Sequence, residues 1–191
     1  MKKTVEALWW CAFAGVLIFL SFPFRSVPYS GYWPLTWVAL VPLLMVLPGV
    51  SPKRAFWYGW LTGAVTNFGG FWWIEHVLHE FGHLPSVISW GLSGLNAGYQ
   101  GLQYAIFAWL LVRLWGPADR RPSVFRIAVI YTGVEVLFPM IFPWYLGNSQ
   151  YPFPAAIQVA DLAGPTGVTF EVVVANGLVL RLMERVREGR P

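Results

Sequence analysis

Apolar residues dominate six segments of the chain, and short stretches that hold charged residues or prolines separate these segments. A helix needs about 20 consecutive apolar residues to cross the hydrocarbon core of a bilayer. The pattern therefore predicts an all-α integral membrane protein, in which residues 1–191 form a single transmembrane domain with a bundle of about six helices. We place the membrane spans at residues 5–24, 33–50, 55–78, 86–112, 124–143 and 163–183.

The composition supports this prediction. Of the 191 residues, 57% are hydrophobic and 12% are charged, whereas soluble domains carry about 25% charged residues. The N-terminus has a basic start, but its apolar run is long and aromatic and no Ala-x-Ala-like cleavage site follows. We therefore expect a retained first span rather than a cleaved signal peptide. The single cysteine, Cys11, excludes an internal disulfide.

Lysine and arginine residues gather on alternate loops. Of the 13 basic residues, all but Arg25 lie before the first predicted span, between or at the facing ends of spans two and three or four and five, or at the end of span six and beyond it. The positive-inside rule then predicts that both termini face the cytoplasm, with residues 25–32, 79–85 and 144–162 on the outer side. The net charge is +4, but no basic stripe with interleaved aromatic residues exists, so we expect no nucleic-acid partner.

Two predicted spans carry glycines four positions apart. These pairs are Gly59 with Gly63, and Gly94 with Gly98. Small residues let helix backbones approach closely in lipid. The pairs therefore predict tight helix packing, or a face of the bundle that lines a cavity.

Residues 79–83 read HEFGH, which matches the His-Glu-x-x-His signature of zinc peptidases. In such enzymes two histidines one helical turn apart bind zinc, and the glutamate acts as general base. Three features oppose this interpretation. Gly82 and Pro85 predict that the helix ends inside the motif, the late acidic residue Asp161 lacks the expected context, and the predicted topology puts the motif at the outer face. A zinc intramembrane peptidase stays an alternative, and we expect neither a metal nor a cofactor.

Several longer stretches resemble one family in order and spacing along nearly the whole chain. They are LSFPF, YWPLTWVALVPLL, GWLTGAVTNFGGFWWIEHVLHEFGHLP, IFPWYLGNSQYPF and IQVADLAGPTGVTFEVVVANGLVL. Together they are similar to the membrane portion of the bacterial apolipoprotein N-acyltransferases. In that comparison HEFGH falls on a Thr-Phe-Gly-Gly-x-Pro stretch of the relatives, so the zinc signature looks accidental.

The resemblance implies a transferase of lipoprotein biosynthesis in the bacterial inner (plasma) membrane. Its members transfer an acyl chain from a phospholipid to the N-terminal cysteine of a diacylated lipoprotein. Their chemistry uses a Glu-Lys-Cys triad in a nitrilase-like domain after a seventh span. This chain offers no counterpart of the triad, so we expect it to be catalytically incomplete. It is either an N-terminal fragment or a non-catalytic lipid-binding module that works with a nitrilase-like partner in trans.

The same resemblance implies a set of substrate-binding residues near the outer ends of the spans. Pro143 ends the fifth span and Trp144, Ser149 and Gln150 follow it; an aromatic-belt or structural role is open for each. At Glu171 the chain departs from the family, in which this position of span six is usually apolar. A carboxylate within a span points to a site or a partner, whereas a protonated one could simply pack, and both roles stay open. The full set is Trp73, Phe81, Gly82, Pro143, Trp144, Ser149 and Gln150.

Overall fold

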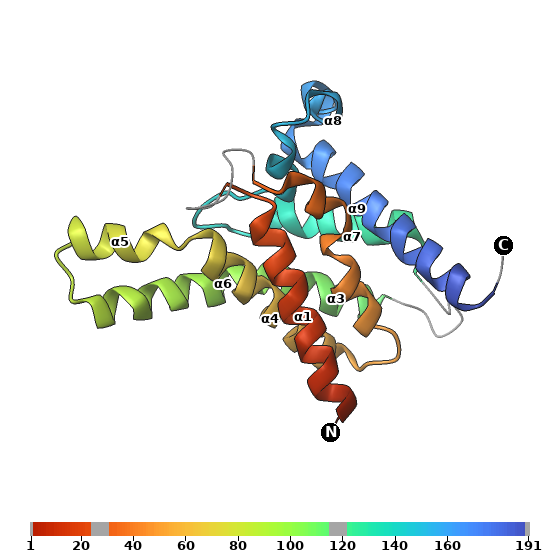
Figure 1. The fold of residues 1–191 in the computed structure, drawn as a ribbon, viewed down its shortest axis with the longest axis horizontal. Helices are drawn as coiled ribbons and strands as arrows, with labels where there is room; N and C mark the ends of the chain where they lie inside the picture. The colour runs from red at the N-terminus through yellow and green to blue at the C-terminus, as the bar shows by residue number, and fades with distance from the viewer. Residues whose placement is uncertain (1, 24–30, 115–121, 190–191) are drawn as a thin grey trace.

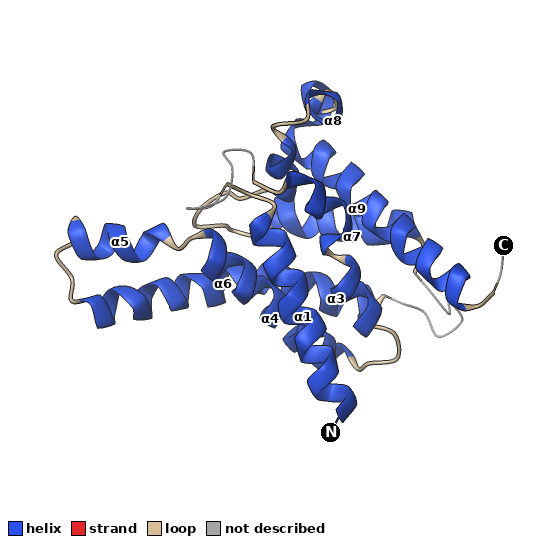
Figure 2. Cartoon of the chain, viewed as in Figure 1, coloured by secondary structure: helices blue, strands red, loops and turns tan. Residues whose placement is uncertain are grey.

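A computed structural model describes residues 2–23, 31–114 and 122–189 (Figure 1). Within these residues every regular element is helical, and no strand occurs (Figure 2). The predicted all-α fold is therefore confirmed. The elements are α1 (Lys2–Leu20), η1 (Trp33–Leu35), α2 (Thr36–Ala39), α3 (Val41–Val46), α4 (Pro52–Gly70), α5 (Trp73–Glu80), α6 (Ser86–Arg113), α7 (Val124–Leu137), η2 (Leu146–Gln150), α8 (Pro154–Ile157) and α9 (Ala160–Arg187).

One helix in the described part of the chain, α9, is long and apolar enough to cross a membrane on the grounds of length and composition. Two further apolar helical stretches are shorter, Thr4–Leu20 and Trp33–Val46. Length and composition thus identify one span in this structure, whereas the sequence pattern predicts six.

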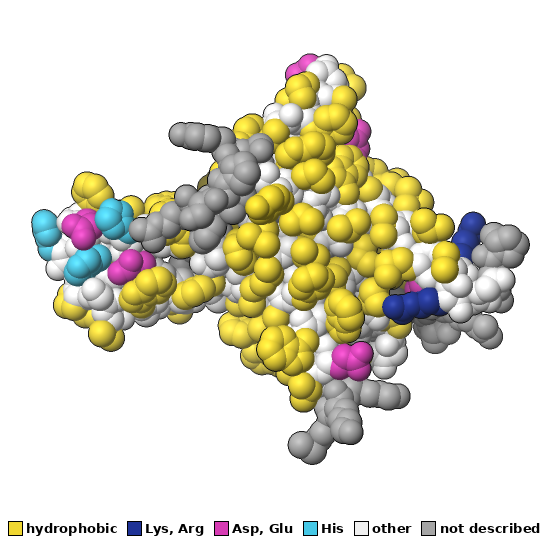
Figure 3. Space-filling model, viewed as in Figure 1, with side chains coloured by type: hydrophobic (Ala, Val, Ile, Leu, Met, Phe, Trp, Pro, Cys, Tyr) yellow, Lys and Arg dark blue, Asp and Glu magenta, His cyan; other side chains and the backbone are white. Residues whose placement is uncertain are grey.

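Large apolar side chains are exposed on several helices (Figure 3). Trp9 on α1 is 73% exposed, Leu137 at the end of α7 is 84% exposed and Leu162 at the start of α9 is 90% exposed. Soluble monomers rarely expose contiguous apolar surface on this scale. This surface is therefore suited to contact with lipid or with a protein partner.

Three predicted spans differ from the observed helices. Residues 33–50 form the short elements η1, α2 and α3 instead of one helix, and residues 55–78 are divided by a turn at 71–72 that separates α4 from α5. The helix predicted to reach 143 ends at Leu137. Phe138 has extended backbone angles because a residue that precedes a proline, here Pro139, is driven out of the helical region.

The start of α9 also carries a break. Gly164 has a φ of +64°, a conformation that favours glycine, and Pro165 follows it. Proline is well suited to the first turn of a helix because its missing N–H has no partner to lose there. The straight part of α9 therefore begins at Pro165, close to the predicted residue 163.

Helices α4 and α6 pack with their backbones in close contact. A Cβ atom added at Gly59 would lie 2.2 Å from the carbonyl oxygen of Tyr104, and one added at Gly63 would lie 2.6 Å from that of Gly101. The first glycine pair thus forms a tight helix contact, as its spacing predicts. The pair on α6 does not, because Gly94 meets open space and Gly98 has its nearest neighbour, Trp60, at 3.6 Å.

The break between α2 and α3 is filled by a side chain from α9. In a continuous helix the N–H of Leu40 would bond to the C=O of Thr36, four residues earlier. Instead, Oδ1 of Asn176 accepts from the N–H of Leu40 and Nδ2 of Asn176 donates to the C=O of Thr36, both at 2.8 Å. Asn176 is fully buried, so its amide takes the place of the missing helical bond and joins α9 to the broken segment.

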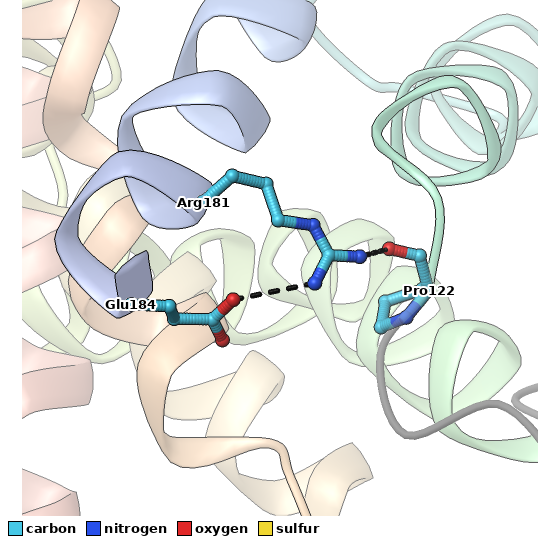
Figure 4. Close-up of polar contacts among 3 residues, drawn as sticks. All are labelled: Pro122, Arg181 and Glu184. Carbon is cyan, nitrogen blue, oxygen red and sulfur yellow. Dashed lines mark hydrogen bonds and ion pairs between the residues drawn. The ribbon is translucent and has the colours of Figure 1, made fainter. Parts of the chain in front are cut away.

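A second link joins α9 to the start of α7 (Figure 4). One guanidinium nitrogen of Arg181 donates to the carbonyl oxygen of Pro122, and another lies 3.2 Å from a carboxylate oxygen of Glu184. Ser123, next in the chain, caps α7 by accepting from the N–H of Arg126. The hydrogen bond to Pro122 and the cap therefore set where α7 begins against α9.

Candidate functional site

Five aromatic side chains from three separate parts of the chain meet near the C-terminal ends of α1, α4 and α7. We call them the aromatic cluster: Phe22, Phe71, Trp73, Phe142 and Trp144. The ring centroid of Trp144 lies 4.5 Å from that of Phe22 and 4.9 Å from that of Phe71. Phe142 lies 5.5 Å from both Phe71 and Trp73. The rings are mostly edge to face, an arrangement that adds attraction beyond burial alone.

The position of Trp144 depends on a glycine. A Cβ atom at Gly70 would lie 1.8 Å from the Trp144 ring, so the indole lies directly on the backbone of α4. Trp144 is half-buried while Trp73 is 37% exposed. The aromatic cluster therefore has a fixed floor at Trp144 and an open edge at Trp73.

The segment after Trp144 is held by buried polar side chains. Oε1 of Glu135 in α7 accepts from the N–H of Leu146, and Oγ1 of Thr169 in α9 accepts from the N–H of Gly147, both at 2.8 Å. Glu135 is 1% exposed and Thr169 is fully buried. Two helices thus fix the start of η2, directly after the aromatic cluster.

Ser149 and Gln150 are fully buried and bond within the protein. The Ser149 hydroxyl donates to the carbonyl oxygen of Leu146 at 2.8 Å and accepts from the Thr36 hydroxyl at 2.9 Å. The Gln150 amide oxygen accepts from the indole N–H of Trp37 at 2.8 Å. Both side chains therefore connect η2 to residues 33–37, and their role in substrate binding stays a prediction.

Replacing Glu135 by alanine is expected to loosen η2, because the buried N–H of Leu146 would lose its acceptor. An unpaired buried amide costs about 1–3 kcal/mol. Hydrogen exchange at the amides of residues 146–150 should become faster, with a lower melting temperature. Glu135→Gln keeps an acceptor oxygen and should behave like the unmodified protein; equal loosening in both variants would contradict this role.

An apolar groove of about 520 Å³ lies between α1, α4 and α6. Its walls include the rings of Phe19, Trp60 and Phe68, and its floor is made of small residues. The indole N–H of Trp60 is bonded to the carbonyl oxygen of Gly98 at 3.0 Å, which fixes one wall. The small residues of the groove are Ala64, Gly69, Gly94, Ala97 and Gly98. The glycine pair on α6 therefore lines a groove, the second of its two predicted roles.

The HEFGH stretch lies at the end of an arm that α5 forms with the start of α6 (Figure 1). The helix ends at Glu80, and His83 lies outside it with a φ of +51°. Nδ1 of His79 is 2.8 Å from the carbonyl oxygen of Leu84. The two histidines do not share a helical face, and no group of three His, Cys, Asp or Glu residues suited to a metal occurs in the described chain.

The structure brings some of the predicted site residues together and separates others. Trp73 and Trp144 share the aromatic cluster, and the exposed Pro143 lies between its members Phe142 and Trp144. Phe81, which is 76% exposed, and Gly82 follow the far end of α5. Eight residues of helix, at 1.5 Å each, place this end about 12 Å from Trp73. A binding role stays a prediction for all five.

Sequence reasoning missed the residues that hold this region in place. Glu135 and Thr169 fix η2, Thr36 joins η2 to the broken segment, and Asn176 joins α9 to that segment. The rule that an ionisable residue within a membrane helix marks a site could have found Glu135. No comparable signal marks the threonines, because buried and exposed hydroxyls look the same in a sequence.

Known proteins are similar to this chain along most of its length. The family model of the apolipoprotein N-acyltransferase N-terminal domain matches residues 14–178. The apolipoprotein N-acyltransferase of Geobacter metallireducens is 32% identical over 93% of this chain and 34% of its own length. Those of Pasteurella multocida and Bdellovibrio bacteriovorus are both 30% identical, over 96% and 87% of this chain and 34% and 30% of their own lengths.

The chain therefore spans about a third of the length of these relatives. The matched region, residues 14–178, includes the whole aromatic cluster, the groove and η2. The resemblance in the sequence motifs is thereby confirmed, and the chain belongs to the apolipoprotein N-acyltransferase family, of which it represents the N-terminal domain.

Proposed function

We propose that this chain is the membrane domain of a lipoprotein N-acyltransferase and holds the phospholipid donor and the diacylated lipoprotein acceptor. The observation that carries the proposal is the family match over residues 14–178. The aromatic cluster and the apolar groove support it, because both offer apolar walls for acyl chains.

In this proposal six segments cross the bacterial inner membrane and both termini face the cytoplasm. The exposed apolar side chains of α1, α6, α7 and α9 then contact lipid rather than water. The alternation of basic loops supports the orientation. The aromatic cluster, η2 and the α5 arm lie on the outer side.

The two apolar features take different parts in the proposal. The groove between α1, α4 and α6 receives an acyl chain, since its wall and floor are almost wholly apolar. The aromatic cluster forms the wall past which lipid or lipoprotein enters, with Trp144 as its fixed floor and Trp73 as its open edge. Pro143, Phe81 and Gly82 contribute to this entrance, and Ser149 and Gln150 act by holding η2 in place.

The acyl-transfer chemistry comes from a nitrilase-like domain, either in the same polypeptide or on a partner chain. Cys11, the sole cysteine, is fully buried in α1, so its thiol cannot meet an acyl donor in this fold. In the second arrangement this chain is a lipid-binding module that presents substrate to its partner. Whether the catalytic domain is in the same polypeptide or on a partner chain, this chain holds the substrates for lipoprotein maturation.

Acyl transfer by the natural protein that contains this chain tests the proposal. Trp144→Ala removes the floor of the aromatic cluster and is expected to lower kcat/KM for the lipoprotein acceptor about tenfold or more, because small losses of alignment are costly in catalysis. Trp109→Ala is the matched control, since Trp109 is exposed on α6 outside the cluster and groove. Equal activity of both variants would contradict the proposal, as would the absence of acyl transfer.

The mass of the native protein separates the two arrangements of the catalytic domain. An antibody to residues 144–162 would detect the protein in its own membrane. A species much larger than 21.6 kDa indicates a catalytic domain in the same polypeptide. A species at 21.6 kDa indicates a partner in trans.

A further inference from the structure

A second cavity lies at the other end of α1 from the aromatic cluster. It has a volume of about 370 Å³ and is formed by the first turns of α1, the end of α3 and the start of α4. Figure 1 shows these three ends near the N-terminus, on the side of the molecule away from α8. In the proposed orientation it opens at the cytoplasmic surface of the membrane.

The cavity has an apolar wall and a polar rim. Trp10, Met45, Val46 and Val50 supply apolar side chains that are only partly covered by the rest of the protein. Arg54 supplies a cation at the rim. A surface with this division fits an amphiphile, whose head contacts the rim while its chain contacts the wall.

Arg54 is suited to hold the head of such a molecule. Its side chain is exposed, and its guanidinium group has no hydrogen-bond or ion-pair partner among the described residues. A guanidinium group offers several N–H donors in a planar fork that matches phosphate oxygens. The N–H of Arg54 is bonded to Ser51, the cap of α4, which fixes the backbone from which the side chain extends.

Glu6 limits which head groups fit. It lines the same cavity and is exposed. A carboxylate at the rim repels head groups that carry several negative charges, and a phosphodiester with a single negative charge meets the least repulsion.

We propose that this cavity binds one phospholipid of the cytoplasmic leaflet, with the phosphodiester at Arg54 and the adjoining acyl chain against Trp10, Met45 and Val46. The lipid is not a substrate here, because the predicted acyl-transfer face lies on the other side of the membrane. The proposal rests on the orientation of the domain and not on its acyl-transfer function. If the acyl-transfer function failed its test, this lipid site would still stand, and if the lipid site failed, the acyl-transfer function would still stand.

Native mass spectrometry of the natural protein in detergent tests this site, with phosphatidylglycerol added as the probe. Arg54→Gln is expected to lower the fraction that retains one phosphatidylglycerol about tenfold, the effect of losing one charge-assisted contact. Lys53→Gln is the matched control, because Lys53 is also exposed and basic but does not line the cavity. It should retain the lipid.

A second variant tests the apolar wall without touching the cation. Ala7 lines the cavity, and Ala7→Phe should fill it and lower retention to a similar extent. Inorganic phosphate serves as the competing head group without a chain, and it should not displace the lipid. Equal loss in the Lys53 and Arg54 variants, full retention in the Arg54 variant, or displacement by phosphate would overturn the proposal.

Discussion

Gly59→Ala is expected to lower the stability of the protein by about 2–3 kcal/mol, the range of a severe overpacking change. The added Cβ would lie 2.2 Å from the carbonyl oxygen of Tyr104 and 2.8 Å from the side chain of Ala108. A backbone oxygen in the middle of α6 cannot move aside, so α4 and α6 would have to separate. The melting temperature in detergent micelles would show the loss.

Gly94→Ala is the matched control for this prediction. Gly94 is also a helical glycine with a second glycine four positions away, but a Cβ atom added at Gly94 would meet nothing within 4 Å. Alanine restricts the unfolded chain more than glycine does, so this variant should gain up to about 1 kcal/mol. The two substitutions should therefore shift the melting temperature in opposite directions, and a similar shift in both would contradict the observed packing.

Asn176→Ala is expected to destabilise the protein by about 2–4 kcal/mol. The change removes the acceptor for the N–H of Leu40 and the donor for the C=O of Thr36. Both groups belong to a buried helix break, and each unpaired group costs about 1–3 kcal/mol. We expect a lower melting temperature and faster hydrogen exchange at the amide of Leu40.

Asn148→Ala makes the same substitution at an exposed position of η2. It should leave the melting temperature nearly unchanged, because no buried backbone group in the described part of the chain bonds to that side chain. If the Asn176 variant were as stable as the Asn148 variant, the bridge between α9 and the α2–α3 break would contribute nothing measurable.

The glycine pairs show how far the sequence alone could predict the packing. The spacing is the same in Gly59/Gly63 and in Gly94/Gly98, and the sequence allowed a packing role and a cavity role for each. The structure uses the first pair for a helix contact and the second pair to line a groove. The difference depends on which face of each helix meets its neighbour, and this is a property of the whole bundle.

The acidic residues show a limit of a different kind. For Glu171 the sequence left open a site or partner and a packing role in protonated form; the residue is half-buried in α9, and its role stays a prediction. Of these two carboxylates, Glu135 is the buried one, with 1% of its surface exposed. Both lie in apolar segments, and their sequence neighbours do not distinguish them. The backbone N–H of Leu146, which makes burial of Glu135 possible, comes from a loop whose path no local pattern predicts.

The breaks in the segment at residues 33–50 also depend on a distant part of the chain. Its prolines were visible in the sequence, and they favour breaks in a helix. Whether such a break is tolerated depends on a partner for the freed backbone groups. Asn176 is that partner, and it lies 136 positions beyond Leu40 in the sequence. The family motifs contain this asparagine, but its structural role could be read only from the fold.

The aromatic cluster was anticipated in part. Trp73 and Trp144 were predicted as site residues from motifs that lie far apart in the sequence, and the structure places them in one cluster through Phe71 and Phe142. Ser149 and Gln150 came from the same motifs, but they are fully buried residues of η2. Motif resemblance therefore located the region, while the direction of each side chain required the fold.

Cross-linking with a photoreactive diacylated lipopeptide tests most directly whether this domain holds the lipoprotein substrate. The natural protein would be labelled in its membrane, and the labelled peptides would be mapped with and without excess unlabelled lipopeptide. The account predicts competed labelling in the peptides that contain residues 70–73 and 142–144, which hold four of the five members of the aromatic cluster. Labelling that competes only elsewhere in the protein, with none in these two peptides, would contradict it.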